Sequence, residues 1–106
     1  MPEIRAHSDF VTQITTAEAE DGKQDELLAL MSERARFMTR QPGFISISLH
    51  RSLDGTRIVN YVQWENADLL SAAHRSPEFR DKWPRFGQLT GDATPALYDV
   101  VKILER

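Results

Sequence analysis

The chain of 106 residues contains no cysteine. This absence excludes disulfides, thiolate chemistry, cysteine-ligated zinc sites and iron–sulfur clusters. Long apolar runs are missing too. No stretch is long enough to span a membrane, and no apolar signal segment stands at the N-terminus. We therefore expect a cytoplasmic protein with no membrane partner.

The chain also lacks an excess of positive charge. It has 13 Lys and Arg against 16 Asp and Glu, a formal net charge of −3, and no basic run or basic–aromatic stripe. This balance argues against nucleic acid as a partner. The histidines His7, His50 and His74 lie far apart, and none belongs to a HExxH-like pair. The sequence therefore proposes no metal site.

What remains is the pattern of one soluble α+β domain over residues 1–106. Asn66 and Ser76 are predicted helix caps, and Pro77 a first helical residue. Strands are predicted over 9–18, 44–52, 56–65 and 96–104, one helix between Asp21-Gly22 and Gln41-Pro42-Gly43, and shorter helices over 67–75 and after Ser76. This β-α-β-β-α-β order predicts a ferredoxin-like fold, with a four-stranded antiparallel sheet and helices on one face.

The two middle strands are apolar on both faces. Ile45, Ile47 and Leu49 alternate with Phe44, and Ile58 and Val62 alternate with Val59 and Tyr61. A sheet that is apolar on both sides needs both sides covered, and the helices cover only one. We therefore expect a homodimer in which a second copy covers the open face, the alternative being a monomer with a mildly apolar exposed face.

The segment 42–66 is unusually polar for a buried hairpin. Its strands carry an imidazole, an amide and an indole among core residues, together with small hydroxyls and a glutamine; these are His50, Asn60, Trp64, Ser46, Ser48 and Gln63. Polar side chains are costly to bury unless something satisfies them. The hairpin is therefore a candidate pocket wall.

The register of this hairpin decides which side chains share a face, and the turn allows two registers. A two-residue Asp54-Gly55 loop would pair Leu49 with Asn60 and Ile45 with Trp64. A one-residue slip would move every side chain to the other face.

The second reading is a three-residue loop with Gly55 in the left-handed position of a bulge. It would pair Ser48 with Asn60 and Phe44 with Trp64. We prefer it because it gathers the small and polar residues, His50 among them, on one face and the aliphatic residues on the other.

At these residues the chain resembles the antibiotic biosynthesis monooxygenase family. The resemblance is carried by Gln41-Pro42-Gly43-Phe44, by the run from His50 to Thr56 and by Val59-Asn60-Tyr61-Val62-Gln63-Trp64-Glu65. It follows the element order of nearly the whole chain but is dense only over 41–66. The chain looks most like members that oxidise anthrone-type polyketide intermediates to quinones. The resemblance implies a dimeric α+β barrel.

The resemblance also implies an oxygenase without metal, flavin or haem, acting on a small aromatic substrate and O2. It implies Asn60 as a hydrogen-bond donor to a substrate oxygen, Trp64 as an indole donor or stacking wall, and His50 as a proton acceptor. Arg80 would hold an anionic oxygen, and Ser48 and Phe44 would contact the substrate. The haem-degrading relatives place an asparagine on the first strand; here that strand offers Thr12-Gln13, so haem degradation is not expected.

Two other functions remain open on this scaffold, because one fold hosts many functions. One is a non-catalytic or stress-associated barrel that binds an aromatic ligand without turnover. The other is a different enzyme, a small-quinol monooxygenase or an isomerase. His74, Trp83 and Tyr61 are expected to be packing or surface groups.

Overall fold

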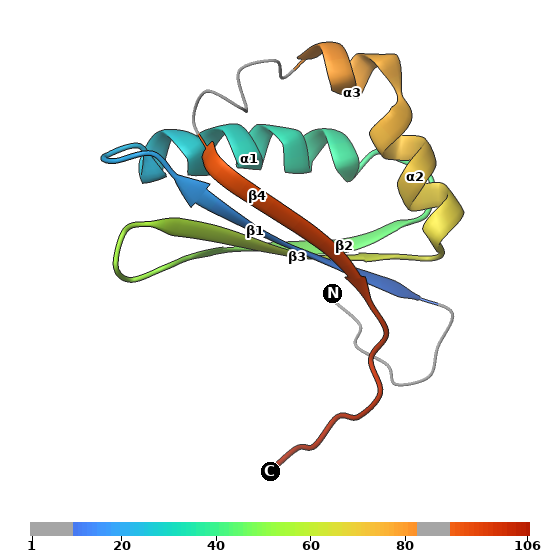
Figure 1. Cartoon of the computed structure of the whole chain (residues 1–106). Coiled ribbons are helices and arrows are strands. Elements are labelled where there is room, and N and C mark those ends of the chain that lie inside the picture. The colour runs from blue at the N-terminus through green and yellow to red at the C-terminus, as the bar shows by residue number, and fades with distance from the viewer. Residues whose placement is uncertain (1–9, 83–89) are drawn as a thin grey trace.

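The computed structural model describes residues 10–82 and 90–106. Its elements in chain order are β1 (Val11–Ala19), α1 (Gln24–Met38), β2 (Phe44–Arg51), β3 (Arg57–Trp64), α2 (Ala67–Arg75), α3 (Pro77–Lys82) and β4 (Thr90–Tyr98). The strands form one antiparallel sheet in the order β2-β3-β1-β4, with the helices over one face (Figure 1). The predicted ferredoxin-like α+β fold is confirmed. No helix within the described ranges has the length and apolar character to cross a membrane.

The two predicted caps are confirmed at the start of the second and third helices. The Asn66 side-chain oxygen accepts a hydrogen bond from the Leu69 N–H at 2.9 Å, and the Ser76 hydroxyl accepts one from the Phe79 N–H at 3.1 Å. Each cap satisfies an N–H that the first turn of a helix leaves without a partner. The caps therefore fix where α2 and α3 begin, and with them the positions of the side chains that they hold over the sheet.

The last strand lies earlier in the chain than predicted. The run 96–104 is the more apolar one, but β4 spans Thr90–Tyr98 and residues 99–106 continue beyond the sheet (Figure 1). The prediction was wrong because it followed apolar content, whereas the strand begins in the more polar segment before that run, which contains Pro95. β4 is an edge strand, and it accommodates Pro95 opposite Thr15.

The preferred register of the β2–β3 hairpin is wrong over most of its length. Leu49 pairs with Asn60, as in the two-residue reading, so Ile47 and Leu49 share the helix-covered face with Asn60. The register shifts between Phe44 and Ser46, where Ile45 is one extra residue in β2. Beyond this bulge Phe44 pairs with Trp64, which is the pairing that the preferred reading gave.

The turn explains the error, because it is neither of the two loops that were considered. Gly55 is left-handed, with φ 81°, but it lies in a longer loop in which the Ser52 N–H donates to the Arg57 carbonyl at 3.0 Å. The Asp54 carboxylate closes this loop by accepting from the Thr56 hydroxyl, the Ser52 hydroxyl and the Thr56 N–H. These hydrogen bonds lower the pKa of Asp54 to about 2. Side-chain bonds, and not the glycine, therefore set the register.

Between the sheet and the helices the core divides into two clusters. Ala17, Leu27, Met31 and Ile58 form one at the end of the sheet near the hairpin turn. The other forms around Trp64 and consists of Phe37, Met38, Val62, Trp64, Leu70, Ala73 and Phe79. The space between sheet and helices is not filled completely, and the remaining cavity is the candidate site.

Candidate functional site

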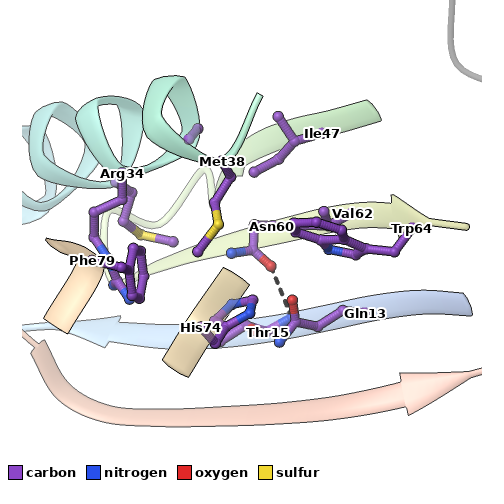
Figure 2. A pocket seen from close by; sticks show the side chains of 12 residues that line it. Gln13, Thr15, Arg34, Met38, Ile47, Asn60, Val62, Trp64, His74 and Phe79 are labelled. Carbon is purple, nitrogen blue, oxygen red and sulfur yellow. Dashed lines mark hydrogen bonds between the residues drawn. The ribbon is translucent and has the colours of Figure 1, made fainter. Parts of the chain in front are cut away.

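A cavity of about 310 Å³ lies between the sheet and the helices (Figure 2). Its size is within the range of roughly 300–1,000 Å³ that is usual for small-molecule sites. The strands contribute Gln13, Thr15, Ile47, Asn60, Val62 and Trp64, and the helices contribute Met31, Arg34, Ala35, Met38, His74 and Phe79. The lining is mainly apolar and aromatic, with a few polar groups, which suits one compact aromatic ligand.

Strand alternation explains the floor of the cavity. Successive side chains of a strand point to opposite faces, so Asn60, Val62 and Trp64 all point toward the helices. The expectation that Asn60 and Trp64 lie in one pocket wall is confirmed. Their wall also contains Ile47 of β2 and Thr15 of β1, which pair with Val62 and Asn60.

The orientation of the Asn60 amide is fixed by a backbone donor. The Thr15 N–H donates to Asn60 Oδ1 at 3.2 Å (Figure 2). An N–H can only donate, so the oxygen of the amide must face Thr15 and the Nδ2 group is turned away from it. Within the described chain no group accepts a hydrogen bond from Nδ2. Asn60 therefore presents a preoriented donor in the cavity wall.

Among the described residues Trp64 is the largest fully buried side chain, with no exposed surface. The Phe44 ring packs edge-on against it, with ring centroids 5.6 Å apart and an interplanar angle of 89°. Phe44 therefore supports the indole from behind and is not among the residues that line the cavity. Among the described residues the Trp64 indole N–H has no hydrogen-bond acceptor. A buried donor of this kind costs about 1–3 kcal/mol unless a ligand or water satisfies it.

Arg34 of α1 is a charged member of the cavity lining. Its guanidinium carbon lies 4.8 Å from the centre of the Phe79 ring, in a cation–π arrangement. Burial lowers the pKa of Arg34, but a guanidinium stays protonated at physiological pH. Sequence reasoning missed this residue as a site group, although it stands in the apolar stripe of the first helix at helical spacing from Met31 and Met38. A charged residue within an otherwise apolar helix face could have indicated that Arg34 belongs to a site.

His74 of α2 lines the cavity as well, and it was expected to be a packing or surface group. Its ring lies 5.4 Å from the Phe79 ring and 6.2 Å from the Trp64 ring, measured between centroids. Burial, and secondarily the charge of Arg34, lower the pKa of His74, although the Leu70 carbonyl opposes them. His74 is therefore held in its neutral form at neutral pH.

The pH dependence of stability follows from this shift. In the unfolded chain His74 titrates near its ordinary pKa of 6.5, and in the folded protein it binds a proton less readily. The unfolded state then binds more protons below pH 6.5, so the free energy of unfolding falls as the pH drops from 6.5 to the lowered folded-state pKa. Urea unfolding at pH 7.5, 6.5 and 5.5 should show this fall in the wild type and a smaller one in His74→Asn. Equal falls in both proteins would contradict the assignment.

Two of the predicted site residues lie on the other side of the sheet. Ser48 and His50 pair with Tyr61 and Val59, so they share the face without helices, where both are exposed. The Ser48 hydroxyl and His50 Nε2 are 2.9 Å apart and bond to each other. The expectation that they share a pocket with Asn60 is wrong, because it depended on the incorrect register. Arg80 belongs to α3, but its side chain lies outside the described residues.

Comparison with known proteins agrees with the resemblance seen in the sequence. Residues 10–82 match the model of the antibiotic biosynthesis monooxygenase family. A segment of 57 residues is 35% identical to the tetracenomycin-F1 monooxygenase of Streptomyces glaucescens, and it covers 54% of this chain and 48% of that protein. The matched segment thus spans about half the length of this curated relative.

Solved structures show the same fold. SnoaB, a cofactor-independent oxygenase from Streptomyces nogalater, superimposes with a TM-score of 0.83 at 25% identity, covering 93% of this chain and 100% of that one. A conserved protein from Methanosarcina mazei Go1 has a TM-score of 0.76 at 14% identity, with 86% and 92% covered. Because the family model matches well over half of the chain, the protein belongs to the antibiotic biosynthesis monooxygenase family.

Proposed function

We propose that the protein is a cofactor-independent monooxygenase that oxidises an anthrone-type polycyclic aromatic polyketide to a quinone with O2. The observation that carries this proposal is the directed amide donor of Asn60 in an aromatic cavity, beside a buried indole whose N–H has no partner in the described part of the chain. Asn60 Nδ2 is left over when its oxygen accepts from Thr15, and the buried indole N–H of Trp64 has no acceptor among the described residues. The activities named for the tetracenomycin-F1 enzyme and SnoaB support it.

The reaction needs no external reductant, because the substrate supplies the electrons. Removal of a proton from the methylene carbon of an anthrone gives a carbanion whose charge is delocalised onto the carbonyl oxygen. The carbanion forms a C–O bond to O2, and the resulting peroxide takes up a proton. Loss of the second methylene proton then breaks the O–O bond, so that one oxygen atom becomes the new carbonyl and the other leaves as water. One anthrone and one O2 thus give one quinone and one H2O.

The cavity provides what the first step requires, which is stabilisation of charge on the carbonyl oxygen. A donor directed at that oxygen gains strength as negative charge develops, and it works best where water is excluded. Asn60 is placed for this role, and Trp64 lies on the same strand face beside it. The cation of Arg34 makes the cavity favourable for the anion as a whole.

The direct test is O2 consumption with a soluble anthrone such as 1,8-dihydroxyanthrone. We expect uptake well above the rate of autoxidation without protein, one O2 consumed per quinone, no H2O2, and one atom of ¹⁸O from labelled O2 in the quinone. The protein as purified should be active after dialysis against a chelator. Saturable quenching of tryptophan fluorescence with all of the anthrone recovered unchanged would instead favour the ligand-binding alternative.

We propose in addition that two copies associate through the face without helices. The partly exposed side chains of Ile14, Val59 and Tyr61 lie on this face, and Tyr98 of β4, which pairs with Thr12, is 49% exposed on it. Apolar groups left accessible on a sheet face that no helix covers indicate an interaction surface. Light scattering at micromolar concentration should give twice the mass of the chain, and a monomer mass would contradict this.

A further inference from the structure

We propose that His74 is the catalytic base of this site, and that its Nε2 takes the methylene proton of the bound anthrone and passes it to the peroxide. This inference rests on the proposed function and assigns the proton acceptor, a role for which the sequence had suggested His50. It is carried by the ring's hydrogen bond, by its place in the cavity wall and by the composition of that wall.

The tautomer of His74 follows from its hydrogen bond. Nδ1 lies 2.9 Å from the carbonyl oxygen of Leu70. A carbonyl oxygen can only accept, so Nδ1 must carry the hydrogen, and the lone pair of the neutral ring is then on Nε2. Within the described residues nothing else bonds to the ring nitrogens. The histidine therefore has a basic atom that the fold does not use.

The position of the ring is fixed on three sides. The Leu70 carbonyl anchors Nδ1, the ring of Phe79 meets it at 71°, and the indole of Trp64 lies at a centroid distance of 6.2 Å. Leu70 itself is buried in the core, and α2 begins at the Asn66 cap. In the view of Figure 2 the imidazole lies beside Phe79 and below Asn60. A ring held in this way needs no reorganisation before it accepts a proton.

The composition of the wall singles out the same residue. The described lining contains no carboxylate, no lysine and no tyrosine, and its other ionisable side chain is Arg34, which is always protonated. The Arg34 cation faces the imidazole from α1, whereas β3 and α3 turn the uncharged Trp64 and Phe79 toward it. On α2 itself the charged neighbours are Asp68 and Arg75, which are exposed. Arg34 thus opposes premature protonation of His74 and stabilises the anion that forms when His74 acts.

The proton balance closes with a single histidine. Nε2 removes the first methylene proton and becomes cationic while the anthrone becomes a carbanion. After the C–O bond to O2 has formed, the Nε2–H donates its proton to the terminal peroxide oxygen, and His74 is neutral again. It then accepts the second proton from the same carbon as the O–O bond breaks, and this proton joins the departing hydroxide as water.

The experiment separates proton removal from oxidation. An anthrone labelled with deuterium at the methylene is incubated with the protein without O2, and loss of the label to water is followed by NMR. The wild type should catalyse this exchange above background, and His74→Asn should lower its rate about 10²–10⁴-fold, the usual contribution of a general base. The asparagine amide preserves a donor for the Leu70 carbonyl but offers no base. Added imidazole should restore part of the exchange.

The competing arm is His50→Asn, the same substitution on the open face. As the pH is lowered, we expect the exchange rate of the wild type to decline with an apparent pKa below 6.5. This acid-side decline should be absent in His74→Asn and present in His50→Asn. The reverse result, or full exchange in a folded His74→Asn, overturns the inference.

If His74→Asn does not fold, His74→Gln is measured in its place with the same criteria. Exchange that is intact in the wild type without any O2 uptake would refute the proposed oxygenase and leave the base in place, whereas O2 uptake with an unaffected His74→Asn would refute the base alone.

Discussion

Asn60→Ala is expected to reduce kcat for anthrone oxidation by about 10²–10³-fold, which is the usual loss when one donor to a developing oxyanion is removed. The reason is the direction of Nδ2, which the Thr15 N–H enforces by holding Oδ1 at 3.2 Å. The donor strengthens its bond as the carbonyl oxygen gains charge, so kcat should fall more than KM rises. Steady-state O2 uptake over a range of anthrone concentrations measures both constants.

Asn60→Asp is the matched control, because it keeps an oxygen that can accept from Thr15 and has nearly the same shape. If Asn60 served only to satisfy the Thr15 N–H, Asn60→Asp would retain most of the activity. We expect instead that it loses at least as much as Asn60→Ala, because it replaces the donor by an acceptor that repels an anionic substrate. Activity near that of the wild type in Asn60→Asp would refute the assigned role.

Trp64→Phe shows whether the two donors act on one oxygen. Phenylalanine keeps an aromatic ring opposite Phe44 but removes the indole N–H, so the loss should be smaller than for Asn60→Ala. If both groups bond the same substrate oxygen, the loss in the double variant should differ from the product of the single losses, since residues with a shared partner are not additive. Independent losses would place the two groups on different atoms of the ligand.

The sequence predicted the fold because strand and helix signals are local. Alternating apolar residues, two helix caps and the Pro42-Gly43 break define most elements within a few residues. The edge strand was misplaced because the prediction followed the most apolar run, whereas an edge strand tolerates polar residues and a proline, and the sequence does not say which strand is at the edge. The register of the hairpin failed for a related reason. It depends on the Asp54 side chain in the turn and on the bulge at Ile45, and neither leaves a pattern in the alternation of the strand.

The site was only half visible from the sequence. Asn60 and Trp64 could be identified because a polar and an indole side chain at alternate strand positions need a shared reason to be buried. His74 is harder to recognise, because its importance depends on how α2 crosses the sheet. A weak signal exists, since Leu70, Ala73 and His74 follow the spacing of one helix face and the first two are buried. Read this way, His74 is an ionisable residue on an apolar face.

Gly43 connects this geometry to the stability of the fold. It stands between α1 and β2 with a φ of 86°, and its carbonyl accepts the Glu65 N–H at 2.8 Å, at the end of β3. A Cβ atom at this position would lie 2.7 Å from the Cβ of Leu69 on α2. The glycine of the Pro42-Gly43-Phe44 motif thus allows α2 to pack directly on the end of the hairpin. The same helix carries His74, five residues after Leu69.

Gly43→Ala should therefore lower the free energy of unfolding by ~2–5 kcal/mol. About 1–2 kcal/mol comes from an L-residue in a left-handed conformation, and about 1–3 kcal/mol from the overpacking against Leu69. Gly55→Ala is the matched control, because Gly55 has a similar φ of 81° but open space around it, so it should lose only the first part. Urea unfolding of both variants measures the difference. Because the helix that carries His74 must move to admit the methyl group, Gly43→Ala should also slow anthrone oxidation, whereas Gly55→Ala, in the distant turn, should not. Equal losses of stability in the two variants would show that Leu69 yields without cost and that Gly43 matters for its conformation alone.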